Sequence, residues 1–188
     1  TVNLNKCLGG YRFDAELGRG MAMNDDFEFF NERLFYDENT GVLYWKNTEL
    51  VGCKVRGKLA GSLKSNGYLV VMIKKNGKHI RVLGHRLAWL FSKGYFPKTS
   101  LDHINGDKLD NRIENLRCAS VGENCQNRKK AYRNNKLGAL GVCLDHGKYR
   151  AQIRINGIKT HIGMYDTIKD ASDAYIQAKR EHHSFCTI

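Results

Sequence analysis

The residue types best suited to chemistry gather in residues 101–124, which read LDHINGDKLDNRIENLRCASVGEN. The imidazole of His103 can be neutral at cellular pH and can take a proton from water, since an unperturbed histidine has a pKa near 6.5. Carboxylate and amide oxygens, such as those of Asp102 and Asn124, suit Mg²⁺ or Mn²⁺. Hydrolysis of a phosphodiester needs both an activated water and a cation that neutralises charge on the phosphate.

These side chains need a scaffold, and the same stretch predicts one. A short strand ends at His103, and a polar loop leads to a second strand at 116–119. Ser120 and Glu123 then match a capping box, in which two side chains satisfy the first amides of a helix. The pattern predicts a β-β-α unit with His103 on one strand and Asn124 in the first turn of the facing helix.

Each of these features has a simpler interpretation when it is taken alone. An Asp-His pair is common on protein surfaces, and the loop that follows could be an ordinary turn or half of a calcium loop. The oxygen-bearing residues of the loop lack the alternate-position spacing of an EF-hand. They are Asp102, Asn105, Asp107 and Asp110. The combination of strand, loop and capped helix favours a nuclease.

Residues 84–130 resemble the HNH nucleases, in the branch of phage-type homing endonucleases whose third motif position is asparagine. The motif is carried by Asp102-His103, by Asn115 and by Asn124, at the spacing of the family. The resemblance implies that His103 is the general base and that Asp102 and Asn124 bind one divalent cation, Mg²⁺ or Mn²⁺. It also implies that Asn115 either orients His103 or steadies the loop between the strands.

The pair His85-Arg86 also belongs to the pattern of this family. Two roles stay open for these side chains. They either pack the following helix and donate to backbone, or they contact a phosphate of the DNA near the metal.

The region before the β-β-α unit is predicted to be rich in strands. Residues 1–26 contain several glycines and little periodicity, so we expect a poorly ordered leader there. A short helix is expected at 27–33, and Asn76-Gly77 predicts a tight hairpin turn between two strands. Residues 27–127 are therefore predicted to form an HNH nuclease domain with a β-rich N-terminal part.

The residues that follow are basic and are predicted to form a linker at 128–137. This stretch begins with Arg128, Lys129 and Lys130 and contains no acidic residue. It is either a solvated helix end or a cationic strap across the phosphates of DNA.

Residues 138–188 are predicted to form a second domain of three strands and one helix. Apolar and polar residues alternate from Tyr149 to Ile155, as they do in a half-buried strand. Asn156-Gly157 predicts a hairpin turn, and Thr167 is a suitable N-cap for a closing helix. Alternation by itself indicates only a half-buried sheet whose charged face is solvated.

The segment GVCLDHGKYRAQIRINGIKTHIGMYDTIKDASDAY resembles the apetala/ethylene-response-factor type of DNA-binding domain. The resemblance implies that the exposed face of the sheet enters the major groove, where arginine reads guanine and glutamine pairs with adenine. The residues on that face are Lys148, Arg150, Gln152, Arg154, Lys159 and His161. The predicted fold class is α+β: a ββα-metal nuclease core preceded by a β-rich region, plus a three-stranded antiparallel sheet packed on one helix.

The composition agrees with a nucleic-acid partner. The 31 Lys and Arg residues exceed the 19 Asp and Glu residues, which gives a formal charge of +12. Such an excess favours a polyanion, here double-stranded DNA before a membrane surface, and no apolar run approaches the roughly 18 residues of a membrane span. We expect a cytoplasmic protein, in a bacterial host cell if a phage encodes it, that is a monomer or a weak homodimer.

The six cysteines form no Cys-x-x-Cys pair, so no zinc is expected. Two other functions stay open. One is a DNA-binding regulator that carries a decayed nuclease core, and the other is an RNA-processing nuclease, because basic charge does not distinguish RNA from DNA.

Overall fold

A computed structural model describes residues 23–188 of the chain. Residues 1–22, which make up most of the leader predicted at 1–26, lie outside the described residues. The first helix begins at Met23, four residues before the predicted start at 27. The side chain of Asp26 accepts a hydrogen bond from the buried Lys75. This ion pair anchors the first turn of the helix to the strands, which sequence periodicity could not indicate.

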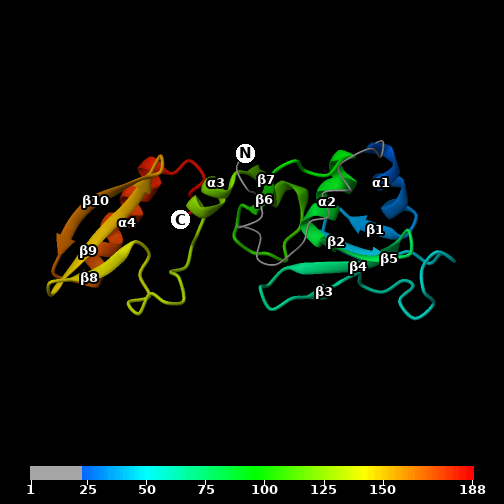
Figure 1. Ribbon diagram of the computed structural model, residues 1–188, viewed down its shortest axis with the longest axis horizontal. Helices are drawn as coiled ribbons and strands as arrows, with labels where there is room; N and C mark the ends of the chain where they lie inside the picture. The colour runs from blue at the N-terminus through cyan, green and yellow to red at the C-terminus, as the bar shows by residue number, and fades with distance from the viewer. Residues whose placement is uncertain (1–22) are drawn as a thin grey trace.

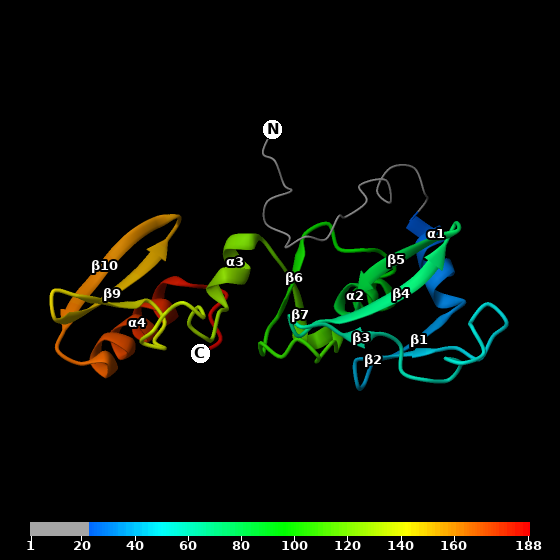
Figure 2. The same cartoon turned by 60° about the horizontal axis from the view of Figure 1, so that its bottom comes forward.

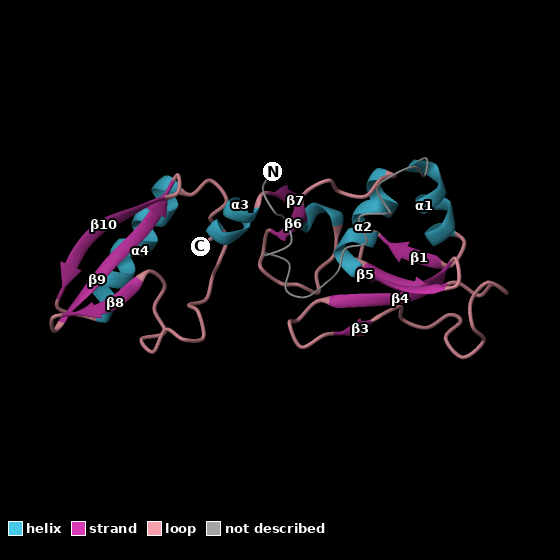
Figure 3. Ribbon diagram, in the orientation of Figure 1, coloured by secondary structure: helices cyan, strands magenta, loops and turns pink. Residues whose placement is uncertain are grey.

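The described chain contains α-helices and small antiparallel sheets, which confirms the predicted mixture of the two (Figure 3). The helices are α1 (Met23–Asn31), α2 (Gly84–Lys93), α3 (Val121–Gln126) and α4 (Ile168–His182), with a 3-10 turn η3 (Ile113–Asn115). The strands are β1 (Leu34–Asp37), β2 (Val42–Trp45), β3 (Ser62–Leu63), β4 (Leu69–Lys75), β5 (Lys78–Leu83), β6 (Ser100–His103), β7 (Leu116–Ala119), β8 (Val142–Asp145), β9 (Lys148–Ile155) and β10 (Ile158–Tyr165).

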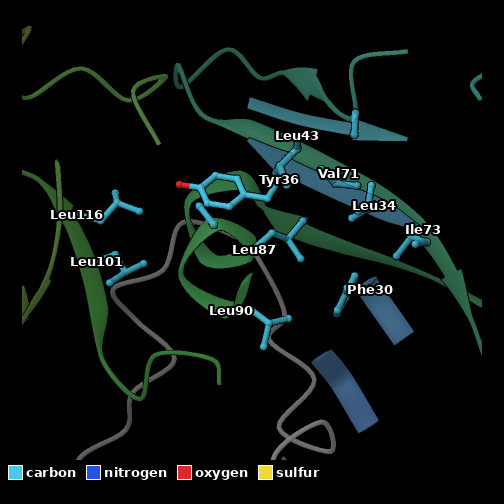
Figure 4. Close-up of a cluster of buried hydrophobic side chains, with 12 residues drawn as sticks. Phe30, Leu34, Tyr36, Leu43, Val71, Ile73, Leu87, Leu90, Leu101 and Leu116 are labelled. Atoms are coloured by element: carbon cyan, nitrogen blue, oxygen red, sulfur yellow. The ribbon is translucent and has the colours of Figure 1, made fainter. Parts of the chain in front are cut away.

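The N-terminal region, residues 23–127, is built around helix α2. The hairpin β1-β2 and the sheet β3-β4-β5 supply aromatic and aliphatic side chains to the same core as α2 (Figure 4). Leu87 and Leu90 of α2 are completely buried, and the capping Gly94 has the left-handed conformation (φ 79°) in which glycine is at ease. Leu101 and Leu116 extend this core to β6 and β7, so the β-β-α unit packs on the same core.

The β-β-α unit lies in the middle of the molecule, between the N-terminal region's core and the C-terminal module (Figure 1). Strands β6 and β7 pair antiparallel, and α3 follows β7 directly. The capping box is confirmed: the Ser120 hydroxyl accepts from the backbone N–H of Glu123, whose carboxylate accepts from the N–H of Ser120. These two bonds fix where α3 begins, and therefore which of its side chains face β6.

The C-terminal module, residues 138–188, is a sheet in the order β10-β9-β8 with α4 packed against one face (Figure 2). Ala151 and Ile153 of β9 are buried, as the alternation predicts, and the Thr167 hydroxyl accepts from the N–H of Asp170 at the start of α4. Gly141 approaches the ring of Tyr175 so closely that an added Cβ would lie 2.1 Å from it, and its φ is +66°. Only glycine satisfies both conditions there.

Candidate active site

Asp102 and His103 are the last two residues of β6, and both are buried, with 5% and 4% of their surface exposed. The strand register places Asp102 opposite Arg117 and His103 opposite Leu116. Successive side chains of a strand point to opposite faces of the sheet. Asp102 and Arg117 therefore share one face, and His103 lies on the other.

The imidazole of His103 is held through one nitrogen. Its Nε2 lies 3.3 Å from Oδ1 of Asn111, a residue with only 2% of its surface exposed. Because an amide oxygen is an acceptor, Nε2 carries the ring proton and Nδ1 keeps a free lone pair. Burial lowers the pKa of His103, although the Asn111 hydrogen bond and the charge of Asp102 oppose this effect. The ring is neutral at pH 7 and can accept a proton at Nδ1.

Two further rings lie against His103. The His85 ring meets it edge-on with centroids 5.2 Å apart, and Tyr68 lies 6.0 Å from His103 and 5.3 Å from His85. Burial, with smaller contributions from His103 and Arg86, lowers the pKa of His85 to about 3. Burial and the charge of Asp102 raise the pKa of Tyr68. His103 is thus lined by uncharged rings that do not compete for its proton.

The two carboxylate oxygens of Asp102 have different surroundings. Oδ2 accepts hydrogen bonds from Nε and Nη2 of Arg117, at 3.0 and 2.8 Å, and from Nδ2 of Asn127 at 3.0 Å. Oδ1 makes no hydrogen bond to any residue between 23 and 188. One lone-pair-bearing oxygen of a fixed carboxylate is therefore available as a ligand.

This oxygen fits a hard cation of the Mg²⁺ type. Among residues 23–188 no three His, Cys, Asp or Glu side chains form a cluster that could hold a metal. Mg²⁺ does not require such a cluster, because it is commonly bound by one or two carboxylates while it keeps several waters and contacts substrate phosphates. Oδ1 of Asp102 is a donor of that kind.

The two other motif asparagines have distinct positions. Oδ1 of Asn115 accepts from the N–H of Asn105, and its Nδ2 donates to the carbonyl of Asp110, at 2.9 and 2.8 Å. Asn115 therefore steadies the loop, whereas Asn111 holds the His103 ring. Asn124 is half-buried on α3, and its side chain makes no hydrogen bond to the described part of the chain.

His85 and Arg86, at the start of α2, are largely occupied within the fold. His85 is 6% exposed and packs against the rings described above. Arg86 donates to the carbonyls of Pro97 and Thr99 and lies over the Phe96 ring. Both side chains therefore make packing and backbone contacts, and their contact with a phosphate stays a prediction.

The basic segment after α3 runs between the N-terminal region and the C-terminal module. Arg128 lies over the Tyr132 ring at 3.7 Å, and its carbonyl accepts a hydrogen bond from the buried Lys179 of α4. Lys129 donates to the carbonyl of Asn105 at 2.9 Å, beside the candidate site, while Lys130 is exposed. The segment therefore contacts both parts of the molecule.

The outer face of the C-terminal sheet gathers most of the residues predicted to contact DNA. The register sets Gln152 opposite His161 and Arg154 opposite Lys159. Four of the predicted residues line one shallow hollow with Asp145 and Met164: Arg150, Gln152, Lys159 and His161. Acidic partners reduce the charge of two members of the predicted set, since Arg150 pairs with Asp145 and Lys148 with Asp166.

Four residues of the site were missed from the sequence: Tyr68, Asn111, Arg117 and Asn127. Arg117 has a usable signal, because pairing the two predicted strands sets it opposite Asp102. Asn111 lies in a loop without periodicity, and Tyr68 is distant in sequence. Asn127 comes directly after α3, where the predicted capping box gives the start of the helix but not its end.

Comparison with known proteins agrees with the site. Residues 82–126 match the model of a family described as HNH endonuclease, which spans β6, β7 and α3 with Asp102, His103, Asn115 and Asn124. The match and the buried acid-imidazole pair support a nuclease hydrolase. Comparison with curated proteins gave no match.

Among solved structures, the chain is similar to one described as "DNA binding and cleavage by the HNH homing endonuclease I-HmuI". The identity is 21%, the match covers 81% of this chain and 88% of that chain, and the TM-score is 0.42. Within residues 23–188 no helix has the length and apolar character needed to cross a bilayer.

Proposed function

We propose that this chain is a metal-dependent DNA endonuclease that hydrolyses phosphodiester bonds at preferred sites. The observation that carries the proposal is the pair on β6: a buried, neutral His103 beside Asp102, whose Oδ1 is available to a cation. Both residues lie inside the segment that matches the HNH endonuclease family.

In this mechanism His103 activates the attacking water. Asn111 fixes the ring through Nε2, so Nδ1 faces the reaction as the proton acceptor. The surrounding rings of Tyr68 and His85 exclude water from one side of the imidazole and keep it neutral. A general base that is held in this way contributes roughly 10²- to 10⁴-fold to a rate.

Asp102 and Asn124 would hold the cation, as the family resemblance implies, with the remaining positions left to water and to phosphate oxygens. A bound Mg²⁺ or Mn²⁺ supplies a Lewis acid that neutralises the phosphate and stabilises the leaving 3′ oxygen. Asn115 and its bonds to Asn105 and Asp110 keep the adjacent loop in place. One base and one cation act on one strand, so nicking is the elementary step, and a double-strand cut needs a dimer or two successive nicks.

We assign cutting to residues 27–127 and DNA reading to residues 138–188, with the basic linker 128–137 lying along the backbone. Arg154 and Lys159 support this assignment, since they are exposed, like-charged and directly opposite each other. Such a pair destabilises a bare sheet, and a phosphate between the two side chains removes the repulsion. A homing endonuclease of phage type is the biological role that the resemblance favours.

The test is cleavage of supercoiled plasmid by the full-length chain with Mg²⁺ or Mn²⁺. We expect the wild-type protein to produce nicked circles and His103→Ala to cut about 10²- to 10⁴-fold more slowly with unchanged DNA affinity. His182→Ala, which removes an exposed histidine of α4, is the matched control and should cut like wild type. Chelation of the metal should stop cleavage by every variant.

Three results would contradict parts of this proposal. Full activity of His103→Ala would remove the assigned base. Tight DNA binding without cleavage by any variant would instead identify a regulator with a decayed nuclease core. Preferential cleavage of RNA in a parallel assay would identify an RNA-processing nuclease.

A further inference from the structure

The segment that follows α4 returns to the β-β-α unit. In Figures 1 and 2 the red end of the chain lies beside α3, far from the outer face of the C-terminal sheet. The hydroxyl of Thr187 lies 2.6 Å from Oδ1 of Asn127 and 3.0 Å from the carbonyl of Ile104. The carbonyl of Phe185 accepts from Nη2 of Arg117 at 2.7 Å, and the Phe185 ring lies 4.1 Å below the guanidinium.

The residues that receive these contacts are the two that bind Asp102. Arg117 and Asn127 together supply all three hydrogen bonds to Oδ2 of Asp102 that arise within the described chain. The carbonyl of Phe185 binds Arg117, and the hydroxyl of Thr187 binds Asn127. Contacts therefore lead from the end of the C-terminal module to the candidate metal ligand Asp102, with one intermediate side chain, Arg117 or Asn127, in each case.

Three oxygen acceptors decide which way the Asn127 amide faces, and Thr187 lies on its other side. Its Nδ2 lies within 3.3 Å of three oxygens, on Asp102, His103 and Ile104. A reversed amide would set its own oxygen against these acceptors. In this orientation the one hydrogen of the Thr187 hydroxyl is donated to Asn127 Oδ1 on the other side, and this bond holds the amide in place with its NH₂ group toward Asp102.

From this geometry we propose that Thr187 is a positioning residue of the nuclease site, which fixes Asn127 and through it the metal ligand Asp102. The C-terminal module then has a second role besides DNA reading, because its final segment completes the outer shell of the cation site. Outer-shell partners of this kind orient ligating carboxylates and tune their affinity for metal. The inference rests on the proposed function, since it concerns the same Asp102.

The experiment measures Mn²⁺ binding to the full-length protein in the absence of DNA, from the EPR signal of free Mn²⁺. Thr187→Val keeps the shape of the side chain but removes the hydroxyl, and we expect it to weaken Mn²⁺ binding by about two- to tenfold, the span of one hydrogen bond. Thr187→Ser restores the hydroxyl and should return the affinity to that of wild type. Asn127→Ala removes the direct partner and should weaken binding by about 10- to 100-fold.

Ser184→Ala is the matched control, because Ser184 is an exposed residue of the same segment whose side chain makes no hydrogen bond to the described chain. It should bind Mn²⁺ like wild type. In cleavage assays, Thr187→Val should need more metal for half-maximal rate and regain the wild-type rate at saturating metal, with KM for DNA and the melting temperature unchanged.

The outcomes separate the two claims. Wild-type Mn²⁺ affinity in Thr187→Val, with a wild-type protein that cuts DNA, would overturn the positioning role and leave the nuclease proposal intact. A lower melting temperature without any change in Mn²⁺ affinity would reduce the segment to a structural anchor and would overturn the inference as well. A wild-type protein that neither cuts DNA nor binds Mn²⁺ would overturn the proposed function and this inference together.

Discussion

The molecule uses one arrangement twice, a three-stranded antiparallel sheet with a helix against one face, and the two copies differ in what lies between sheet and helix. In the N-terminal region α2 and the sheet β3-β4-β5 enclose large side chains, including Val71, Leu87 and Leu90, none of which is exposed at all. In the C-terminal module the residues without exposed surface in the cluster between α4 and the sheet β8-β9-β10 are small, namely Ala151 and Ala171.

This difference fits the roles that we propose for the two regions. A catalytic base must be held to a fraction of an ångström, and a close-packed core transmits position without slack. His85 and Leu87 of α2 link that core directly to the site, because one touches His103 and the other lies in the cluster that contains Leu101. A surface that reads DNA, as we propose for the C-terminal sheet, must follow the shape of its partner, and we expect a thin core with half-buried tyrosines to allow this.

The two cores should differ most in what the loss of a buried valine costs in stability. Val71→Ala and Val142→Ala remove the same atoms from buried positions in the two sheets. We expect Val71→Ala to cost about 2.5 kcal/mol, from two methyl groups and a cavity that cannot collapse. Val142→Ala should cost about 1 kcal/mol, because the half-buried side chains around it can close the gap.

Both tryptophans, Trp45 and Trp89, lie in the N-terminal region, so their fluorescence follows that region alone during urea unfolding. Val71→Ala should move the fluorescence transition, while Val142→Ala should move only part of the far-UV circular dichroism transition. An equal displacement of the fluorescence midpoint by both variants would mean that the two regions unfold as a single unit.

The sequence predicts the strands and the helix of the site better than the contacts between residues that lie far apart along the chain. Strands β6 and β7 and the start of α3 follow from short-range signals, namely a polar loop between apolar runs and the capping box at Ser120 and Glu123. The contact between Thr187 and Ile104 joins residues 83 positions apart, and no local pattern encodes it. Burial of His85 likewise depends on residues distant in sequence, because the rings of Tyr68 and of His103 on β6 cover it.

The next effect concerns acid, which should weaken the N-terminal region selectively. The pKa of His85 is about 3 in the folded protein and near 6.5 when unfolded, so between these values only the unfolded chain binds the proton. The contribution of the uncharged His85 to the free energy of unfolding is therefore fully present above pH 6.5 and is lost as the pH falls toward 3. Tyr68, His103 and Arg86 face this imidazole, and the lowered pKa of His103 acts in the same direction.

Between pH 7 and pH 5 the loss from His85 should be about 2 kcal/mol, at 1.36 kcal/mol for each pKa unit. Urea unfolding followed by tryptophan fluorescence at the two pH values measures it. His85→Phe, which keeps a ring in place, should lose about 2 kcal/mol less than wild type over this interval. If the two proteins lose the same stability, the burial of an uncharged His85 is not what makes the region acid-sensitive.

The smallest effect is expected at Lys159, on the outer surface of the C-terminal sheet. Lys159 is exposed, lines the hollow with Gln152 and His161, and stands opposite Arg154. If it neutralises one phosphate, Lys159→Ala should lower the slope of log K against log salt by about 0.9, while the slope that remains reports the other contacts. Because the substitution also relieves repulsion with Arg154 in the free protein, the loss of affinity at physiological salt should be modest, on the order of 1 kcal/mol or less.

Lys169→Ala, on exposed α4 at the opposite side of the module, removes the same charge from the chain. It should leave the slope unchanged, because net charge acts at long range whereas counterion release requires contact. Equal slopes for the two variants would assign DNA binding to the overall charge of +12 instead of to this face of the sheet.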